Sequence, residues 1–419
     1  MKDLLVLTVG TQKEPIIVSI RDKKPSKILF IASKETKKHI SEIETELEKE
    51  CVDCIKGISS VECISNENDV ERCWTEIRGH VNEFMRKNDA SPSDISIDFT
   101  CGTKAMVGAL LLVACEMEVG SLRYVGGERD ENGGRVISGH ERIQSLKPRQ
   151  ISDERRISEI KSLFKMHRFD ACSRIADELF DKNYREFYKS VSEFYRMWDN
   201  FNHEKALCVL ESALSSSKNC LNDDQRRVLV PNNEDFLKKL IEDTKSQKYS
   251  IYEIVDLLEN AKRRLDEGKY DDAVARCYRL TEFLVQYALY NNNPKIETSN
   301  VDLILLNQPR FNENFGYLLK DPAHKNRKSI QLPSKLAYDF LRVADPNHPL
   351  IKKYDEYWKN GLEKLLNSRN DSILAHGTSP VMKETAEKFV GMVAELCKSV
   401  FKTEKEFEEL RSRTRFLQF

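Results

Sequence analysis

The pattern of apolar residues changes once along the chain, and this change is the strongest constraint on its fold. Up to about residue 145, short apolar runs alternate with longer segments of helical periodicity. From Ile151 onward the strand pattern disappears and helical periodicity takes its place. Alternating strands and helices predict a mostly parallel sheet with helices on both faces. We therefore expect an α/β domain at the N-terminus, followed by all-α structure.

The α/β part has a definite order of predicted elements. Its strands are short apolar runs at Leu4–Val9, Lys27–Ala32, Val61–Ile64, Ile95–Phe99 and Leu122–Val125. Helices are predicted between them, over residues 34–50, 68–87 and 104–119. The segment Gly126–Ile143 has two adjacent glycines between polar runs, which predicts a hairpin that closes the domain.

The length of 419 residues is too great for one ordinary core. We predict three domains: an α/β domain over residues 1–147, a helical connector over 148–250, and a helical domain over 251–419. Residues 163–179 and 265–284 share a short pattern, which fits either packed helix pairs or loosely repeated helical hairpins.

Charge and cysteine content limit the class of protein. The formal net charge is −1, so nucleic acid would have to bind a local basic patch rather than the whole surface. Lys320–Lys335 is one such segment, and it fits either an RNA contact or a solvated insertion. Eleven scattered cysteines, and the lack of a secretory pattern or a membrane-length apolar run, predict a cytoplasmic protein without membrane contact.

Two predicted strands run into polar loops that suit a phosphate-bearing ligand. The first leads into Gly10, Thr11 and Gln12, and the fourth leads into the loop Thr100-Cys101-Gly102-Thr103-Lys104. Free backbone N–H groups at a strand-to-helix turn favour phosphate, and ligands bind at the carboxyl ends of parallel strands. Ordinary turn and helix-capping chemistry would explain the same residues. Neither loop has a dinucleotide or nucleoside-triphosphate motif.

These loops resemble those of the CARF domain, the Rossmann-like sensor of type III CRISPR systems. The resemblance rests on Thr8-Val9-Gly10-Thr11 and on the run Asp98 to Met106. It implies a homodimer that binds a cyclic tetra- or hexa-adenylate as an allosteric activator. The implied contacts are Gly10, Thr11, Gln12, Ser33, Thr100, Cys101, Gly102, Thr103 and Lys104. Relatives often have glycine where Cys101 stands.

Near the C-terminus, Arg369 and His376 lie seven residues apart in a segment of helical periodicity. They continue a stripe of residues at helical spacing, Trp358, Leu362, Leu365, Arg369, Ser372 and His376. The pattern predicts one helix over about 355–376, ended by Gly377 and packed against a helix over Leu265–Leu289. Because buried charges without partners are costly, the two residues form either a core polar network or a functional site.

The segment Arg369-Asn370-Asp371-Ser372-Ile373-Leu374-Ala375-His376 resembles the motif of HEPN domains. Together with the N-terminal loops, it makes the chain similar to CARF–HEPN proteins. The resemblance implies a metal-independent endoribonuclease that cuts single-stranded RNA and needs no cofactor, with Arg369, Asn370 and His376 as catalytic residues. In this chemistry the RNA 2′-hydroxyl attacks, histidine moves protons, and arginine stabilises the phosphate.

Helix geometry favours a site shared by two chains. Seven helical residues separate two Cα atoms by about 10 Å, which strains a single-chain site. We therefore expect one composite centre in a homodimer. Two other functions remain open. The first is a non-catalytic oligoadenylate-binding regulator or scaffold, and the second is a ring nuclease that degrades its own ligand through Thr11, Thr103 and Lys104.

The pair Cys51 and Cys54, followed by Cys63 and Cys73, was weighed as a zinc site. A structural zinc site usually has two short segments that each carry a closely spaced pair of ligands, and these cysteine spacings supply one such pair. We predict no metal site.

Overall fold

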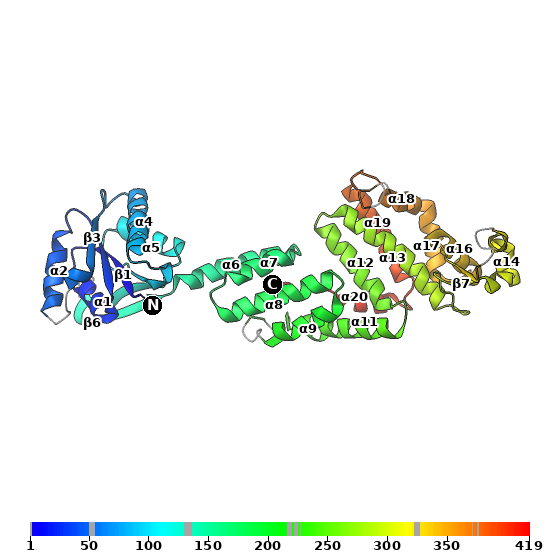
Figure 1. Cartoon of the computed structure of the whole chain (residues 1–419), viewed down its shortest axis with the longest axis horizontal. Coiled ribbons are helices and arrows are strands. Elements are labelled where there is room, and N and C mark those ends of the chain that lie inside the picture. Colours follow the sequence, from blue (N-terminus) through cyan, green and yellow to red (C-terminus); the bar gives the residue numbers. More distant parts are fainter. Residues whose placement is uncertain are drawn as a thin grey trace. The chain divides into compact units, whose positions relative to one another are not determined.

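The computed structural model describes residues 2–49, 55–129, 136–215, 220–221, 225–226, 228–321, 327–370, 372–374 and 377–419 (Figure 1). The chain forms two compact units. The first comprises Met1–Ser158 with Leu179–Asp181, and the second comprises Glu159–Glu178 with Lys182–Phe419. The three-domain division, with boundaries after residues 147 and 250, stays a prediction.

The first unit is built on one sheet of six strands in the order β3-β2-β1-β4-β5-β6. The strands are β1 (Leu4–Val9), β2 (Lys27–Ala32), β3 (Ser59–Cys63), β4 (Ile95–Asp98), β5 (Ser121–Arg129) and β6 (Val136–Leu146). All neighbours are parallel except β5 and β6, which form the predicted closing hairpin. The predicted α/β, Rossmann-like fold is confirmed. The strand order reverses between β1 and β4, where such sheets bind ligands.

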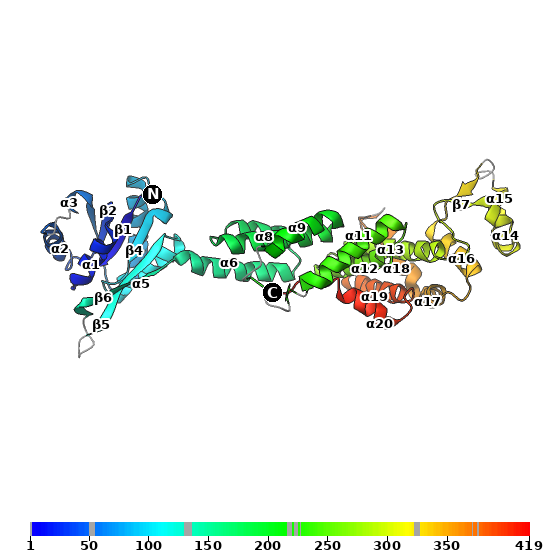
Figure 2. The same cartoon turned by 90° about the horizontal axis from the view of Figure 1, so that it is seen from below.

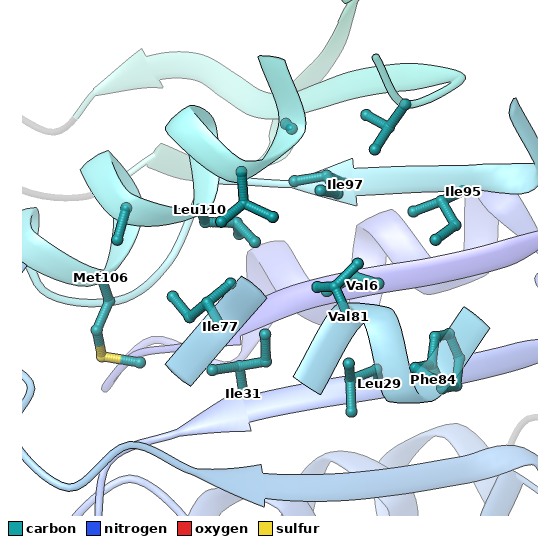
Figure 3. Packing of buried hydrophobic residues seen from close by; sticks show 14 of the residues in the cluster. Val6, Leu29, Ile31, Ile77, Val81, Phe84, Ile95, Ile97, Met106 and Leu110 are labelled. Atoms are coloured by element: carbon teal, nitrogen blue, oxygen red, sulfur yellow. The ribbon is translucent and has the colours of Figure 1, made fainter. Parts of the chain in front are cut away.

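Helices cover both faces of this sheet. One face carries α4 (Val70–Lys87) and α5 (Lys104–Glu116), and the other carries α1 (Glu14–Lys23) and α2 (Lys38–Glu48), with the short α3 (Ile55–Ile58) beside them (Figure 1). Strand residues such as Val6 and Ile97 pack against Ile77 of α4 and Leu110 of α5 (Figure 3). The alternation of strand side chains between the two faces produces these two apolar layers.

Helix α1 was not predicted from the sequence. Its segment follows the Gly10–Lys13 loop directly and contains Pro15. Proline is favoured in the first turn of a helix, where its missing N–H costs nothing. Here it stands at the start of α1, and Ile16, Ile17 and Ile20 form the buried face.

The second unit is helical apart from one two-stranded pairing. Its elements include part of α6 (Pro148–Lys165), then α7 (Phe169–Asp177), α8 (Lys182–Asp199), α9 (His203–Ser215), η2 (Val228–Asn233), α11 (Glu234–Ser246), α12 (Ile251–Asp266) and α13 (Tyr270–Tyr290). They continue with β7 (Val301–Asp302), η3 (Leu303–Asn307), α14 (Pro309–Phe315), α15 (Tyr317–Lys320), β8 (Ser329–Ile330) and α16 (Ser334–Ala344). The last are α17 (Pro349–Tyr357), η5 (Trp358–Leu362), α18 (Glu363–Asn370), α19 (Lys383–Lys398) and α20 (Glu404–Ser412).

The predicted helix Leu265–Leu289 is wrong at its start. The chain leaves α12 at Asp266 and begins α13 at Tyr270, so α12 and α13 form a hairpin. Helix α19 packs against both of them (Figures 1 and 2). Helix α18 contacts α13 as well, which confirms the predicted pairing of these two segments.

The single predicted helix over 355–376 is also wrong. Helix α17 ends at Tyr357, a wider turn η5 follows, and α18 ends at Asn370. Ser372 then bends the chain, since its N–H and its hydroxyl both donate to the Arg369 carbonyl, at 3.2 and 2.8 Å. Such serine contacts compete with helix continuation. Gly377 therefore does not end this helix, although Leu362, Leu365 and Ser372 are buried as the stripe predicted.

A glycine pair tests the kink before α18. Gly361 has φ +98°, a conformation that costs an L-residue about 1–2 kcal/mol, while Gly391 lies in regular α19 with open space around its Cβ position. We expect Gly361→Ala to lower the urea midpoint of the helical circular-dichroism signal. Gly391→Ala should raise the midpoint, because alanine inside a helix is more stable than glycine by up to about 1 kcal/mol. Equal effects of the two substitutions would contradict a strained turn at Gly361.

Candidate ligand loops and candidate nuclease site

The two predicted ligand loops lie against each other at the carboxyl edge of the sheet. Thr8 in β1 donates its hydroxyl proton to the Cys101 carbonyl, and the Cys101 Sγ lies 3.6 Å from the Gln12 carbonyl oxygen. A Cβ on Gly10 would stand only 2.8 Å from the Gly102 backbone nitrogen. The structure therefore brings Gly10–Gln12 and the loop after β4 into one surface.

Two threonines of this surface already have structural roles. Thr103 caps α5, accepting the Met106 N–H at 3.2 Å, and donates its own proton to the Glu67 carbonyl. The Thr100 hydroxyl accepts the Val125 N–H at 2.8 Å. Helix capping and turn formation thus account for threonine at both positions. Exposed groups that can meet a ligand are Thr11, Gly102 and Lys104.

Ser33 lies at the end of β2 and is buried, with 3% of its surface exposed. Its hydroxyl is 3.1 Å from that of Thr36 and accepts the Thr36 N–H at 3.2 Å. This places Ser33 in a local turn. Its predicted ligand contact stays a prediction.

Cys101 is nearly buried between the two loops. Burial, with a smaller contribution from the Asp98 carboxylate, raises the pKa of its thiol to about 12. The thiol is therefore protonated at neutral pH and does not act as a nucleophile.

Asp98 is a residue of this site that the sequence analysis did not select. Its Oδ1 accepts the Thr100 N–H at 2.8 Å, while its Oδ2 is buried without a hydrogen-bond partner among the described residues. Arg123 pairs with Asp98 in register on β5, and its guanidinium bonds to Asp22 of α1. The available signal in the sequence was an acidic residue at the end of a strand that is buried throughout. Asp98 holds the start of the loop in place.

The second candidate site lies at the end of α18. The Arg369 guanidinium stands over the Tyr278 ring of α13, with its carbon 4.8 Å from the ring centre. Asn370 is the last residue of α18, but its side chain lies outside the described part of the structure, as does His376. The predicted meeting of Arg369 with Asn370 and His376 therefore stays a prediction.

Aromatic packing supports the helices that carry Arg369. The Tyr338 ring of α16 stacks on Tyr354 of α17 at 3.6 Å and 13°, and Tyr354 contacts Trp358 in η5. The buried Tyr338 hydroxyl donates to the Thr281 carbonyl of α13 at 2.9 Å. These contacts fix α16 and α17 against α13 and so define where α18 begins.

The basic segment Lys320–Lys335 is only partly described. Lys320, Arg327 and Lys328 are exposed, and the Lys335 ammonium lies 5.4 Å from the Trp358 ring centre. Residues 322–326 lie outside the described residues. The role of this segment stays a prediction.

The described residues contain no group of three or more histidine, cysteine, aspartate or glutamate side chains placed to hold a metal ion. Cys51 and Cys54, weighed as zinc ligands, lie outside the described residues. Across the described helices, none is both long enough and apolar enough to cross a membrane.

The fold and the two sites define a class of protein, a Rossmann-like sensor domain joined to a helical effector domain. Comparison with protein families gives the same answer. The Csm6 6H domain model matches residues 153–251, and the Csm6 HEPN domain model matches residues 242–400. The chain belongs to the CARF–HEPN family of CRISPR-associated proteins, as its sequence predicted. The HEPN domain indicates a ribonuclease.

A solved structure of Csm6 agrees with this chain at the level of the fold. Enterococcus italicus Csm6 bound to cyclic hexa-2′-fluoro-hexa-dAMP is similar over 99% of this chain and 98% of that one, with 14% identity and a TM-score of 0.53. Can2 from Sulfobacillus thermosulfidooxidans in complex with cyclic tetra-adenylate matches over 49% of this chain and 66% of that one, with 11% identity and a TM-score of 0.24. No curated protein matches the chain.

Cysteine labelling tests the packing of the loops. We expect iodoacetamide at pH 8 to modify the exposed Cys208 and to leave Cys101 unmodified, as read by mass spectrometry. With a pKa of about 12, roughly one Cys101 thiol in 10,000 is ionised at that pH. Labelling in urea is the control and should modify both. Equal labelling of Cys101 and Cys208 in the native protein would contradict the closed loops.

Proposed function

We propose that this chain is a cyclic-oligoadenylate-activated endoribonuclease of type III CRISPR defence, acting in the cytoplasm as a homodimer. The N-terminal loops bind the activator, and single-stranded RNA is cut at a site formed by Arg369, Asn370 and His376. The reaction requires no metal ion and no cofactor. The alternatives are a regulator that binds the ligand without cleaving RNA, and a ring nuclease.

The observation that carries the proposal is the placement of Arg369 within the segment that the HEPN model matches. Its guanidinium is held over Tyr278 at the end of α18, so its charge lies at the edge of the helix pair formed by α13 and α18. A planar guanidinium in such a position can bind a phosphate bidentately.

The proposed chemistry uses groups that RNA and the chain already contain. The 2′-hydroxyl attacks the adjacent phosphorus, His376 moves the proton, and Arg369 stabilises the charge that develops on the phosphate oxygens. The P–O5′ bond breaks, giving a 2′,3′-cyclic phosphate and a 5′-hydroxyl. Asn370 orients the phosphate or the histidine.

The surface formed by the two N-terminal loops supports the proposed binding of the activator. Exposed Gly102 and Lys104 stand at the N-terminus of the thirteen-residue α5, where backbone N–H groups and the helix dipole favour phosphate. Csm6 of Enterococcus italicus, which shares this fold, was solved with a cyclic hexanucleotide analogue. A cyclic tetra- or hexa-adenylate is the proposed activator.

The dimer is supported by the composition of α5. This helix is apolar nearly all round: Leu110 and Val113 pack on the sheet, while Leu112, 56% exposed, and Cys115 face outward. A helix that is apolar on every side is normally buried on every side. Because α5 begins at Lys104, pairing α5 with its copy about a two-fold axis that runs along the helix would place two ligand loops next to each other.

A composite nuclease site is supported by apolar residues that flank the motif. Ile373 and Leu374 lie between Arg369 and His376 in sequence, and Met382 follows shortly after. All three are exposed, Ile373 at 71%. Clustered exposed apolar residues mark protein interfaces. A second copy at this place would cover them. The ligand then activates only insofar as it binds the active arrangement of the dimer more tightly than the resting one.

Cleavage of labelled single-stranded RNA in EDTA tests the function. With cyclic tetra- or hexa-adenylate we expect cleavage, and without it little or none. His376→Ala should lower the rate by about 10²–10⁴-fold and Arg369→Ala by about 10²–10³-fold. Lys364→Ala removes an exposed cation from the same helix and should leave the rate unchanged.

Other outcomes select the alternatives. RNA left intact by a protein that binds the ligand would identify a regulator or scaffold. Loss of the cyclic ligand on chromatography, with Thr11→Ala or Lys104→Ala preventing that loss, would identify a ring nuclease.

The dimer is tested by charge on the exposed face of α5. We expect the mass from light scattering to fall from two chains to one in Leu112→Glu, because pairing would bury two like charges across the two-fold axis. The matched control is Met166→Glu, which changes a side chain of similar exposure just after α6 and should remain a dimer. A dimeric Leu112→Glu protein would place the interface elsewhere.

A further inference from the structure

Tyr278 contacts the Arg369 guanidinium, whose carbon lies 4.8 Å from the centre of the Tyr278 ring. It lies on α13 between the buried Cys277 and the exposed Arg279 and is itself half-buried. Burial raises the pKa of its hydroxyl, with a smaller contribution from Glu282, so the ring is neutral at every pH of interest. A neutral aromatic face therefore lies beneath the cation.

The position of Arg369 makes such a support useful. Arginine has a long side chain with many rotamers, and Arg369 lies one residue before the end of α18, where the chain turns at Ser372. A guanidinium at a helix end samples fewer directions when it is held against an aromatic ring. The attraction between the cation and the Tyr278 ring keeps the guanidinium carbon over that ring.

We infer that Tyr278 is a positioning residue for RNA cleavage, holding Arg369 by its face so that the N–H edge of the guanidinium remains directed at the scissile phosphate. The inference rests on the proposed function and adds a residue to it. Stacking uses the π-face of the guanidinium, whereas phosphate binding uses its N–H donors, so the two interactions do not compete. Lysine in place of Arg369 would keep the charge and lose the planar contact.

Charged and aromatic groups also lie beside this contact on α13. Glu282 lies one turn along the helix from Tyr278 and interacts with its hydroxyl. It is paired with Arg279 at 3.7 Å, and the Arg279 guanidinium in turn lies 5.3 Å from the Phe283 ring centre. Two cations thus lie over two separate aromatic rings of the same helix.

Steady-state cleavage by the full-length protein with its cyclic ligand tests the inference. We expect Tyr278→Leu to lower kcat/KM about tenfold, while Tyr278→Phe and Tyr278→Trp, which keep an aromatic face, stay within about twofold of the wild type. The pH dependence of kcat should not change, because Tyr278 does not act through His376. Tyr287→Leu, on the same helix and away from Arg369, is the matched control and should leave kcat/KM unchanged.

A second measurement separates this role from simple packing. 2′-Fluoro RNA lacks the attacking hydroxyl, so its dissociation constant can be measured without cleavage. Tyr278→Leu should weaken its binding several-fold in the wild-type background and have no further effect in Arg369→Ala. An equal loss in both backgrounds, or wild-type kcat/KM in Tyr278→Leu, would overturn the inference.

The two proposals fail in different ways. Absence of ligand-dependent cleavage by the wild-type protein rejects the proposed nuclease, whatever the variants do. The binding measurements in the two backgrounds still test the role of Tyr278 in that case. If Tyr278→Leu weakens RNA binding equally with and without Arg369, the positioning role is overturned. Cleavage by the wild type together with full activity of Tyr278→Leu rejects the positioning role alone.

Discussion

The buried carboxylate of Asp199 is the interaction on which the second unit depends. It stands at the end of α8 and accepts hydrogen bonds from Arg263 at 2.7 Å, from Asn260 at 2.9 Å and from Arg264. Arg264 also pairs with Glu267 at 2.8 Å. Breaking such a pair leaves a buried charge uncompensated, at a cost of about 3–5 kcal/mol. Because α12 turns directly into α13, the network ties α8 to the helix that carries Tyr278.

The C-terminal residues reinforce the same junction. The Tyr195 hydroxyl donates to Asn233 at 2.6 Å and accepts the Leu417 N–H at 2.9 Å, and the Asn233 amide donates to the carbonyls of Arg413 and Arg415. The Phe416 ring lies 4.0 Å from the Arg263 guanidinium carbon. The last residues of the chain thus close the packing between α8 and α12. A movement of α8 would reach α12 and α13 through packed, hydrogen-bonded contacts that have little room to deform.

Local sequence patterns were enough to predict the sheet and the two loops, but not the contacts made across the fold. Strand runs such as Ile28–Ala32 are wholly apolar because both faces of the sheet are covered, and this signal is present without any tertiary information. Helix α1 was missed because its proline reads equally as loop or as first turn. Tyr278 could not be selected, since its partner lies about ninety residues away in sequence. The buried Oδ2 of Asp98, which has no hydrogen-bond partner in the described part of the chain, is likewise visible only in the folded structure.

The end of α18 at Asn370 changes the meaning of the Arg369–His376 spacing. On one continuous helix the two Cα atoms would be about 10 Å apart, and that strain was the original reason for expecting a site shared by two chains. Since the helix ends first and Ser372 turns the chain, helix geometry no longer sets this separation. The case for two chains then rests on the exposed apolar residues Ile373, Leu374 and Met382 and on the outward face of α5. A histidine that follows the helix in sequence would also tolerate a variable number of residues between it and the arginine. An extra residue in a turn can be accommodated locally, whereas an extra residue in a helix would rotate the histidine to another face.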